Sequence, residues 1–400
     1  MGLSVAFVIE ATNGGTARHL LDLANGLVGG GHSVHIIYSR GRAEPRFIEG
    51  LSQLPGVHAA VIDMQRQPQL ADMQACIAIR RYLRRWGPFD IVHGQSSKAG
   101  ALARLATLGF PAARVYTPHC LRTLDPTLGL FGRVAYGWAE LILSHMCEAI
   151  IAVSPDELEH AVRLGIPSCK LHLVLNGVDQ PERLDRTALR TQLGLREDEI
   201  CVGFLARYVP QKAPDRLLEV AMMLRSDLPP FRIAMVGDGP LESMLRARAM
   251  TMGMADRIIF VPGSIGPRAM FAFDVFTLVS AYEGLPYVLL EAAASGLPIV
   301  ATAVGGSTSV VVPGKNGFVV PNWDGRLFAQ QLSRIIQDKE LRLRMGRESR
   351  EISKKFAIQR MVRETVDVYR TAIERRARKQ RSYNVALPES NIGPGRSEHP

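Results

Sequence analysis

The chain contains 400 residues, 47% of them hydrophobic and 22% charged, a composition typical of globular proteins that excludes a fibrous or wholly disordered chain. At ~100–200 residues per domain, this length predicts two or three domains. The 48 lysines and arginines outnumber the 38 aspartates and glutamates, and the net charge of +10 suits an acidic ligand, an anionic membrane face or nucleic acid without choosing among them.

No segment predicts a membrane span or a signal peptide. No run of residues approaches the ~18 uninterrupted apolar positions that a membrane-spanning helix needs. The first residues, MGLSVAFVIEATNGG, lack a basic region and reach a glycine turn early, so they predict a first strand. The five cysteines are scattered, odd in number and without a C-x-x-C pair, which predicts a reducing, cytoplasmic location with no disulfide framework and no zinc site.

Short apolar segments alternate with longer helical segments along the whole chain. In the first half we predict strands over residues 4–10, 32–39, 58–63, 90–95, 113–119 and 149–154. In the second half we predict strands over residues 201–208, 231–239, 257–263, 274–280, 299–304 and 317–321. This alternation is typical of α/β proteins with parallel sheets wrapped by helices, and it predicts two Rossmann-like domains of similar size.

The domain boundary is expected where strands give way to a polar segment, over residues 177–199. We therefore assign one domain to residues 1–180 and a second to residues 181–365. The apolar periodicity is lost near the end of the chain, and residues 383–400 are predicted to form a disordered tail.

Two glycines follow the first predicted strand, in the segment NGGTARHLLDLANGL. Gly14 and Gly15 lie between a strand and a helix, where free backbone amides and the helix N-terminus form a natural anion site. The segment is not a G-x-G-x-x-G motif, and a plain tight turn explains it equally well.

Two histidines end predicted strands of the first half. His93 lies in DIVHGQSSKAG and His119 in VYTPHCLRT. One such histidine is more often a packing or hydrogen-bonding residue, but two at the carboxyl edge of one sheet favour a functional site. No H-E-x-x-H, D-x-D or Cys/His ligand spacing is present, so we predict no bound metal.

The second half carries two cations and a glycine turn after its first two strands. Arg207 and Lys212 lie five residues apart in a loop that precedes a helix. Two cations at the carboxyl edge of a sheet would neutralise a diphosphate, although a pair of exposed loop cations is the commoner explanation. The turn VGDGP, which contains Gly237, is by itself more consistent with a structural role.

The segment SAYEGLPYVLLEAAASGLP, residues 280–298, holds two carboxylates in an otherwise apolar or small-residue run. Pro286 suits the first turn of a helix, and Gly296 suits its end. Glu283 is therefore expected in a strand-to-helix loop at the carboxyl edge of the sheet, where ligands bind, and Glu291 on the helix that follows. On these residues alone, a capping carboxylate and a solvated helix residue explain the two acids equally well.

Together these motifs resemble the retaining GT-B glycosyltransferases of glycosyltransferase family 4, over roughly residues 4–373. The most specific motif is Glu-x7-Glu within EGLPYVLLEAAASGLPIV, accompanied in order by NGGTARHLLDLANGL, GHSV, DIVHGQSSKAG, YTPHC, VLNGVD, GFLARYVPQK and MVGDGP. The resemblance implies a GT-B fold, in which two Rossmann-like domains face each other across a cleft. It also implies that a C-terminal helix, here residues 366–382, crosses back to the first domain.

The resemblance assigns the phosphate and sugar groups of a nucleotide-sugar donor to particular residues. Arg207 and Lys212 match the cations that stabilise the leaving diphosphate, and the amides near Gly284 and Leu285 would contact it. Glu283 would face the transferred sugar.

The remaining family roles concern the nucleoside and the first domain. Glu291 would accept hydrogen bonds from the ribose hydroxyls, and the base would lie near Gly237 and Gly263. Gly15, beside Gly14, would approach the phosphate from the first domain. The family's active-site histidine beside the sugar matches His119.

The resemblance implies transfer with retention, by attack on the same face of the sugar while the leaving phosphate accepts the acceptor's proton. No cofactor is expected beyond the donor itself, and preorganised cations and amides would stabilise the charge that develops. Four positions depart from the family pattern: Gln95, Ala206, Ser309 and Pro313. None removes a donor-site residue, but Ser309, where an acid is frequent, could change how its loop is held.

A predicted helix in the segment ACIAIRRYLRRWG carries a cluster of basic residues beside Ile77, Leu83 and Trp86. The cluster consists of Arg80, Arg81, Arg84 and Arg85. Such a face suits peripheral contact with an anionic membrane. An ordinary solvated helix face is a slightly better explanation of the same residues.

We therefore predict a cytoplasmic enzyme, peripheral on the inner face of the plasma membrane if it contacts lipid. It would move a hexose-type sugar from a nucleoside-diphosphate sugar to a lipid-linked or saccharide acceptor in cell-surface polysaccharide or glycolipid biosynthesis. A small-acceptor transferase of the sucrose-phosphate-synthase kind is one alternative, and a non-catalytic nucleotide-sugar-binding protein is another. Nucleic-acid binding is disfavoured because no recognised motif accompanies the charge.

Overall fold

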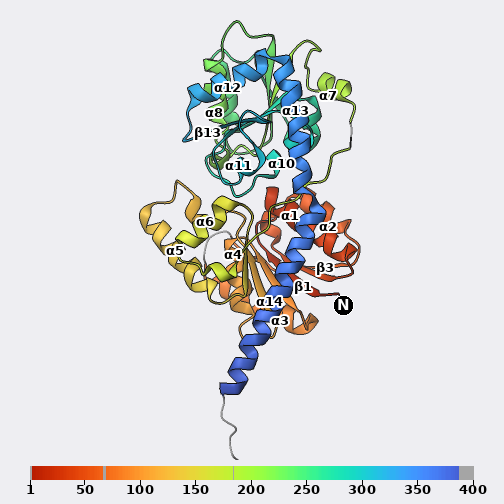
Figure 1. Ribbon diagram of the computed structural model, residues 1–400, viewed down its shortest axis with the longest axis vertical. Helices are drawn as coiled ribbons and strands as arrows, with labels where there is room; N and C mark the ends of the chain where they lie inside the picture. The colour runs from red at the N-terminus through yellow and green to blue at the C-terminus, as the bar shows by residue number, and fades with distance from the viewer. Residues whose placement is uncertain (1, 66–68, 183, 387–400) are drawn as a thin grey trace, which may run out of the picture.

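The computed structural model describes residues 2–65, 69–182 and 184–386, which form two α/β domains joined by a long C-terminal helix (Figure 1). The first domain contains a seven-stranded sheet in which every strand pair is parallel. Its strands are β1 (Ser4–Ile9), β2 (Ser33–Tyr38), β3 (Val57–Val61), β4 (Ile91–Gln95), β5 (Ala113–Thr117), β6 (Ala149–Ala152) and β7 (Leu171–Leu173). Its α-helices are α1 (Gly14–Gly29), α2 (Pro45–Ser52), α3 (Ala71–Trp86), α4 (Ser97–Ala106), α5 (Leu130–Ser144) and α6 (Pro155–Arg163).

The second domain contains a six-stranded parallel sheet. Its strands are β8 (Ile200–Leu205), β9 (Phe231–Val236), β10 (Ile258–Val261), β11 (Val275–Leu278), β12 (Ile299–Thr302) and β13 (Gly317–Val320). Its α-helices are α7 (Arg186–Gln192), α8 (Asp215–Met223), α9 (Glu242–Thr251), α10 (Tyr287–Ala294), α11 (Ser307–Val310), α12 (Gly325–Gln337) and α13 (Lys339–Ser353). The central strands of both sheets are almost wholly apolar and buried because helices cover both faces.

All twelve predicted strands are present, and the α/β fold with two parallel sheets is confirmed. The structure adds β7, which the sequence did not reveal because this strand has three residues and is only partly buried. Within the described residues, no helix combines the length and apolarity required to cross a membrane.

The strand order of both sheets places a ligand-binding crevice at a defined point. The first sheet has the order β3-β2-β1-β4-β5-β6-β7 and the second the order β10-β9-β8-β11-β12-β13. Each order reverses direction beside the first strand, between β1 and β4 and between β8 and β11. Ligands of open parallel sheets bind outside the carboxyl ends of the strands at such a reversal. The loops after β1, β8 and β11 are therefore expected to border the ligand-binding crevice.

The last helix, α14 (Ile358–Ala386), leaves the second domain and runs along the first, as Figure 1 shows. Its residues Met361, Tyr369 and Ala372 are buried in the core that α1 and the first sheet build. The hydroxyl of Tyr369 lies 2.8 Å from Nδ1 of His93 on β4. The predicted boundary before residue 366 falls inside this helix, which continues to Ala386. Residues 387–400, most of the predicted tail, lie outside the described residues.

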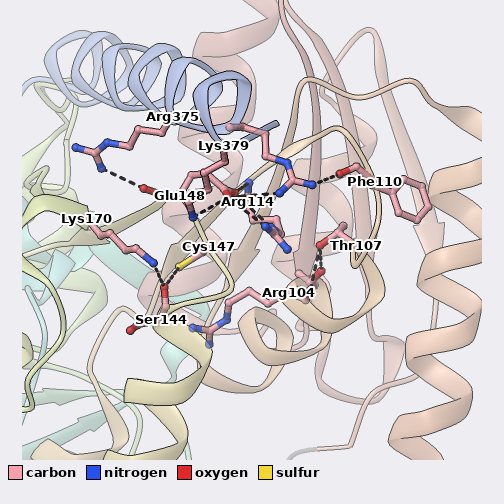
Figure 2. A network of polar contacts seen from close by, with 12 residues as sticks. Arg104, Thr107, Phe110, Arg114, Ser144, Cys147, Glu148, Lys170, Arg375 and Lys379 are labelled. Carbon is pink, nitrogen blue, oxygen red and sulfur yellow. Dashed lines mark hydrogen bonds and ion pairs between the residues drawn. The ribbon is translucent and has the colours of Figure 1, made fainter. Parts of the chain in front are cut away.

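A single buried carboxylate anchors the far end of α14 (Figure 2). The side chain of Glu148 is 0% exposed and accepts hydrogen bonds from the backbone and the guanidinium of Arg114. Two cations of α14, Arg376 and Lys379, approach the same carboxylate at 3.8 and 3.7 Å, and Arg375 donates to the Glu148 carbonyl oxygen. Burial alone would raise the pKa of Glu148, but the bonds and charge of Arg114 outweigh burial and hold the pKa below its usual value.

We expect Glu148→Gln to lower the free energy of unfolding by ~3 kcal/mol at neutral pH, because it leaves a buried guanidinium without its counter-charge. Since the folded state lowers the pKa of Glu148, its stabilisation is present above the unfolded pKa and is lost as pH falls through the folded pKa. The difference between wild type and variant in urea unfolding should therefore shrink in acid. Glu351→Gln, at an exposed ion pair with Lys354, is the control and should change little. A difference that is absent, or that grows in acid, would contradict this assignment.

Candidate active site

A cleft of about 710 Å³ lies between the facing carboxyl edges of the two sheets. Loops after β1 and β5 line it from the first domain, and loops after β8 and β11 line it from the second. The structure brings eight of the predicted site residues into its wall: Gly14, Gly15, His119, Arg207, Lys212, Glu283, Gly284 and Leu285. Three do not line it: Gly237, Gly263 and Glu291.

An ion pair in the second domain forms the charged wall of the cleft. Lys212 ends the short 3₁₀ helix η4 (Pro210–Lys212), and its Nζ lies 2.5 Å from Oε1 of Glu283. Glu283 is 7% exposed, so this pair is largely withdrawn from bulk water. Arg207 is exposed in the same wall, and within the described part of the chain its guanidinium has no hydrogen-bond or ion-pair partner. On the second-domain side, the described residues of the wall therefore offer an incoming anion one unpaired cation, Arg207, and one paired cation, Lys212.

His119 enters the cleft from the first domain as a neutral ring. Its Nε2 lies 2.5 Å from the amide oxygen of Gln95, so Nε2 carries the proton and Nδ1 is the acceptor. Burial, together with the nearby rings of His19 and His93, places the pKa of His119 well below its usual value. Gln95, a departure from the family pattern, thus sets the tautomer of the predicted active-site histidine.

Two glycines allow the loops of the two domains to approach each other. A Cβ at Gly284 would lie 2.1 Å from the carbonyl oxygen of His119, which is too close for any other residue. A Cβ at Gly15 would lie 3.2 Å from the ring of Tyr287 on α10. His119 itself adopts φ of 64°, a left-handed conformation that costs a non-glycine residue ~1 kcal/mol or more. The missing side chain at Gly284 and the left-handed conformation of His119 therefore allow the loops of the two domains to meet.

Asn176 connects the two domains, a role that the sequence did not predict. Its Nδ2 donates to the carbonyl oxygen of Leu285 at 2.9 Å, and its Oδ1 lies 3.1 Å from Nδ1 of His19 on α1. Asn176 follows β7, the strand that the sequence did not reveal, and it belongs to the family-like segment VLNGVD, the one sequence signal at this position. A second bridge joins Tyr282 to Asp125 at 3.0 Å.

Glu291 lies on α10 beside cations of the first domain and outside the cleft wall. Burial raises its pKa to about 7, although the nearby charge of Arg18 on α1 opposes this rise. Asp22, four residues beyond Arg18 and paired with it at 2.6 Å, has its pKa raised by burial to about 6. Within the described residues, no group donates a hydrogen bond to the Glu291 carboxylate. Its oxygens are therefore available to hydroxyl donors.

Gly237 and Gly263 lie together in the second domain, beside an arginine of the first. A Cβ at Gly263 would lie 3.3 Å from Cα of Gly237. The Gly263 amide donates to Asp238, and its carbonyl oxygen accepts from Arg46 of α2 at 3.0 Å. The loop before α11 is also held across the domains, since the Gly306 amide donates to Asp156 of α6 at 2.8 Å. This contact holds the start of α11, the short helix in which Ser309 replaces the acid frequent in the family.

The groups in the wall of the cleft suit a reaction in which charge develops on the leaving group. The wall combines cations, backbone amides and a neutral histidine, an arrangement that stabilises charge developing on a diphosphate. Among the residues that the structure describes, no group of three or more His, Cys, Asp or Glu side chains is placed to hold a metal ion.

Two family models match this chain, one for each domain. Residues 13–180 match the family described as Glycosyltransferase Family 4, and residues 185–352 match the family described as Glycosyl transferases group 1.

Two proteins that are similar in sequence to this chain are glycosyltransferases. D-inositol 3-phosphate glycosyltransferase of Stackebrandtia nassauensis is 30% identical over 315 residues, 73% of this chain and 70% of that protein. UDP-Gal:alpha-D-GlcNAc-diphosphoundecaprenol alpha-1,3-galactosyltransferase of Escherichia coli is 28% identical over 311 residues, 75% of this chain and 80% of that protein.

Solved structures share the fold. HepE of Anabaena, in complex with UDP and glucose, has a TM-score of 0.79 at 19% identity and covers 91% of this chain and 98% of its own. Sucrose-phosphate synthase of Thermosynechococcus elongatus has a TM-score of 0.73 at 20% identity and covers 96% of this chain and 100% of its own. The predicted GT-B fold is confirmed. The chain belongs to glycosyltransferase family 4 and is a retaining GT-B glycosyltransferase that uses a nucleotide-sugar donor.

Proposed function

We propose that this enzyme transfers a hexose from a nucleoside-diphosphate sugar to a lipid-linked saccharide in the assembly of a cell-surface polysaccharide or glycolipid. The observation that carries the proposal is the Lys212–Glu283 ion pair, which lies in the cleft between the facing carboxyl edges of the two sheets. The lipid-linked acceptor is supported by the Escherichia coli relative, whose name specifies a diphosphoundecaprenol-linked sugar. In this proposal residues 1–180 bind the acceptor and residues 181–365 bind the donor.

The diphosphate of the donor takes Lys212 away from Glu283. A phosphate oxygen competes well for an ammonium group because charge-assisted bonds to phosphate are short and strong. Arg207 and the amides of Gly284 and Leu285 receive the other phosphate oxygens. Once Lys212 has moved, the carboxylate of Glu283 accepts a hydrogen bond from a hydroxyl of the bound hexose.

Bond cleavage leaves positive charge on the sugar and negative charge on the diphosphate. Lys212 and Arg207 stabilise the leaving group as its charge grows, while Gly14 and Gly15 add amides from the first domain. The acceptor hydroxyl attacks the same face of the sugar, and the leaving phosphate takes its proton. His119, held neutral by burial and by Gln95, lies beside the sugar and adds no positive charge there.

Glu291 accepts hydrogen bonds from the ribose, and the base lies near Gly237 and Gly263. Both positions are adjacent to residues of the first domain, Arg18 and Arg46, so nucleoside binding and domain contact occur at one place.

A small phosphorylated sugar is the alternative acceptor, since sucrose-phosphate synthase has the same fold. Incubation with UDP-, GDP- and ADP-hexoses and either a diphosphoundecaprenol-linked sugar or fructose 6-phosphate distinguishes the two. Product from the lipid-linked acceptor supports the proposal, and product from the small acceptor alone contradicts it. Nucleotide binding without transfer to either acceptor would indicate a non-catalytic binding protein.

We expect Lys212→Ala to lower kcat by about 10²–10³-fold, because it removes a preorganised cation from the leaving diphosphate. The matched control is Lys315→Ala, which removes a half-exposed lysine paired with Glu348 on the surface and should leave kcat unchanged. Equal thermal stability of both variants would show that the loss is not one of folding. A Lys212→Ala enzyme that turns over at the wild-type rate would refute the assigned role.

We expect the affinity for UDP-glucose to rise as pH increases through about 7, because burial raises the pKa of Glu291 to about 7 and an ionised carboxylate accepts hydrogen bonds from the ribose hydroxyls more strongly than a neutral carboxyl does. Glu291→Gln should weaken binding by roughly tenfold at pH 8, the loss expected for hydrogen bonds to a charged group, and should flatten this rise. Isothermal titration across the pH range measures both effects. Glu197→Gln, on the exposed surface, is the control. An equal pH slope in wild type and Glu291→Gln would assign the titration to another group, such as Asp22, whose charge acts on Glu291 and whose own pKa burial raises to about 6.

A further inference from the structure

The helix α5 is oriented with its polar side inward and its apolar side outward. Of its fifteen residues, only Glu140 and Ser144 are buried. Its large apolar side chains are exposed: Leu130 (80%), Phe131 (88%), Val134 (50%), Trp138 (62%) and Ile142 (60%). We call these five residues the α5 stripe. The last four are spaced three or four positions apart and therefore lie on one face of the helix.

Buried charges fix this orientation. Glu140 accepts a hydrogen bond from the hydroxyl of Tyr116 at 2.8 Å and pairs with Arg104 of α4 at 3.5 Å. Arg104 in turn lies over the ring of Tyr116, 4.1 Å from its centroid. Rotating α5 to bury the stripe would expose Glu140 and leave the buried Arg104 without its counter-charge, which is costly. The stripe is therefore a stable surface feature, and contiguous exposed apolar surface marks an interaction site.

Cations lie near both ends of the stripe. The helix carries two charged residues, of which Arg133 is exposed and Glu140 is buried. At its C-terminal end, Lys170 donates to the carbonyl oxygen of Ser144 at 2.7 Å, and Figure 2 shows Lys379 of α14 nearby. The side chain of Lys379 is 53% exposed.

We propose that the α5 stripe docks the enzyme on an anionic lipid surface, with its aromatic and aliphatic side chains in the acyl boundary and its flanking cations at the headgroups. Apolar side chains beside lysine and arginine suit such a surface, and they do not suit a polar protein partner. The stripe also begins close to the cleft in the chain, because Asp125 and Thr127, which line the cleft wall, precede Leu130 by five and three residues. This inference rests on the proposed lipid-linked acceptor, which would enter the cleft from this side.

From the sequence, the helix that became α3 was a candidate for membrane contact, with an ordinary solvated face slightly favoured, and the structure removes part of that candidate surface. Arg80 points inward, donating to the carbonyl oxygens of Ala106 and Leu108, and Leu83 is 1% exposed in the core. Three arginines remain exposed on α3: Arg81, Arg84 and Arg85. The predicted basic face is therefore incomplete, and α3 becomes the rival surface in the test.

Co-sedimentation with phosphatidylglycerol vesicles, compared with phosphatidylcholine vesicles, tests the proposal. Wild-type enzyme should prefer phosphatidylglycerol and should release as salt is added. The double variant Phe131→Ser/Trp138→Ser should bind phosphatidylglycerol vesicles at least about tenfold more weakly, since it removes two large inserted side chains. Met250→Ser, at a 72% exposed position of α9, is the matched control and should bind as wild type does.

Three results would overturn the proposal. The first is equal vesicle binding by wild type and the double variant. The second is loss of binding in Arg81→Ala/Arg84→Ala/Arg85→Ala but not in the double variant. The third is a wild-type dimer, measured by light scattering, that the double variant dissociates, which would make the stripe a contact between two copies.

The outcome is separable from that of the proposed function. The double variant should transfer sugar to a water-soluble acceptor analogue at the wild-type rate, because neither side chain lines the cleft. Stripe-dependent vesicle binding by an enzyme that transfers no sugar to the diphosphoundecaprenol-linked acceptor would uphold the surface and refute that acceptor. Transfer to that acceptor by an enzyme that does not bind vesicles would uphold the lipid-linked acceptor and refute the α5 stripe as a lipid-docking surface.

Discussion

The close approach of Gly284 to the carbonyl oxygen of His119 is the contact on which the site depends. It is possible only because position 284 has no side chain and because the chain bends at His119 into a left-handed conformation. The contact joins the carboxyl edge of one sheet to that of the other, at the reversals of strand order where ligands bind. The ion pair of Lys212 with Glu283 lies in the wall of the resulting cleft.

The C-terminal helix α14 supports this site through side chains of the first sheet. Tyr369 of α14 lies 2.8 Å from His93, the amide nitrogen of Gln95 lies 3.3 Å from the same ring, and the amide oxygen of Gln95 meets His119. A continuous series of polar contacts thus runs from α14 to the active-site histidine. The buried Glu148 anchors the same helix nearer its C-terminal end. The packing of α14 on the first domain therefore supports both the stability of that domain and the orientation of His119.

The parts that sequence predicted well are those with a local signal. Apolar strands separated by helices predict the two sheets, and glycines or cations directly after strands predict the loops at Gly15, Arg207 and Lys212. The parts that it missed depend on contacts between distant segments. Nothing local shows that Asn176 bridges the domains or that α5 turns its apolar face outward, because both follow from partners, Leu285 and Arg104, far away in the chain.

The central claim is that Lys212 exchanges Glu283 for the diphosphate of the donor. A crystal structure of the enzyme with UDP and the bound hexose tests it most directly. The account predicts that Nζ of Lys212 lies within ~3 Å of a phosphate oxygen and that the carboxylate of Glu283 has turned to a hydroxyl of the hexose. A bound diphosphate with the Lys212–Glu283 pair intact would contradict the account.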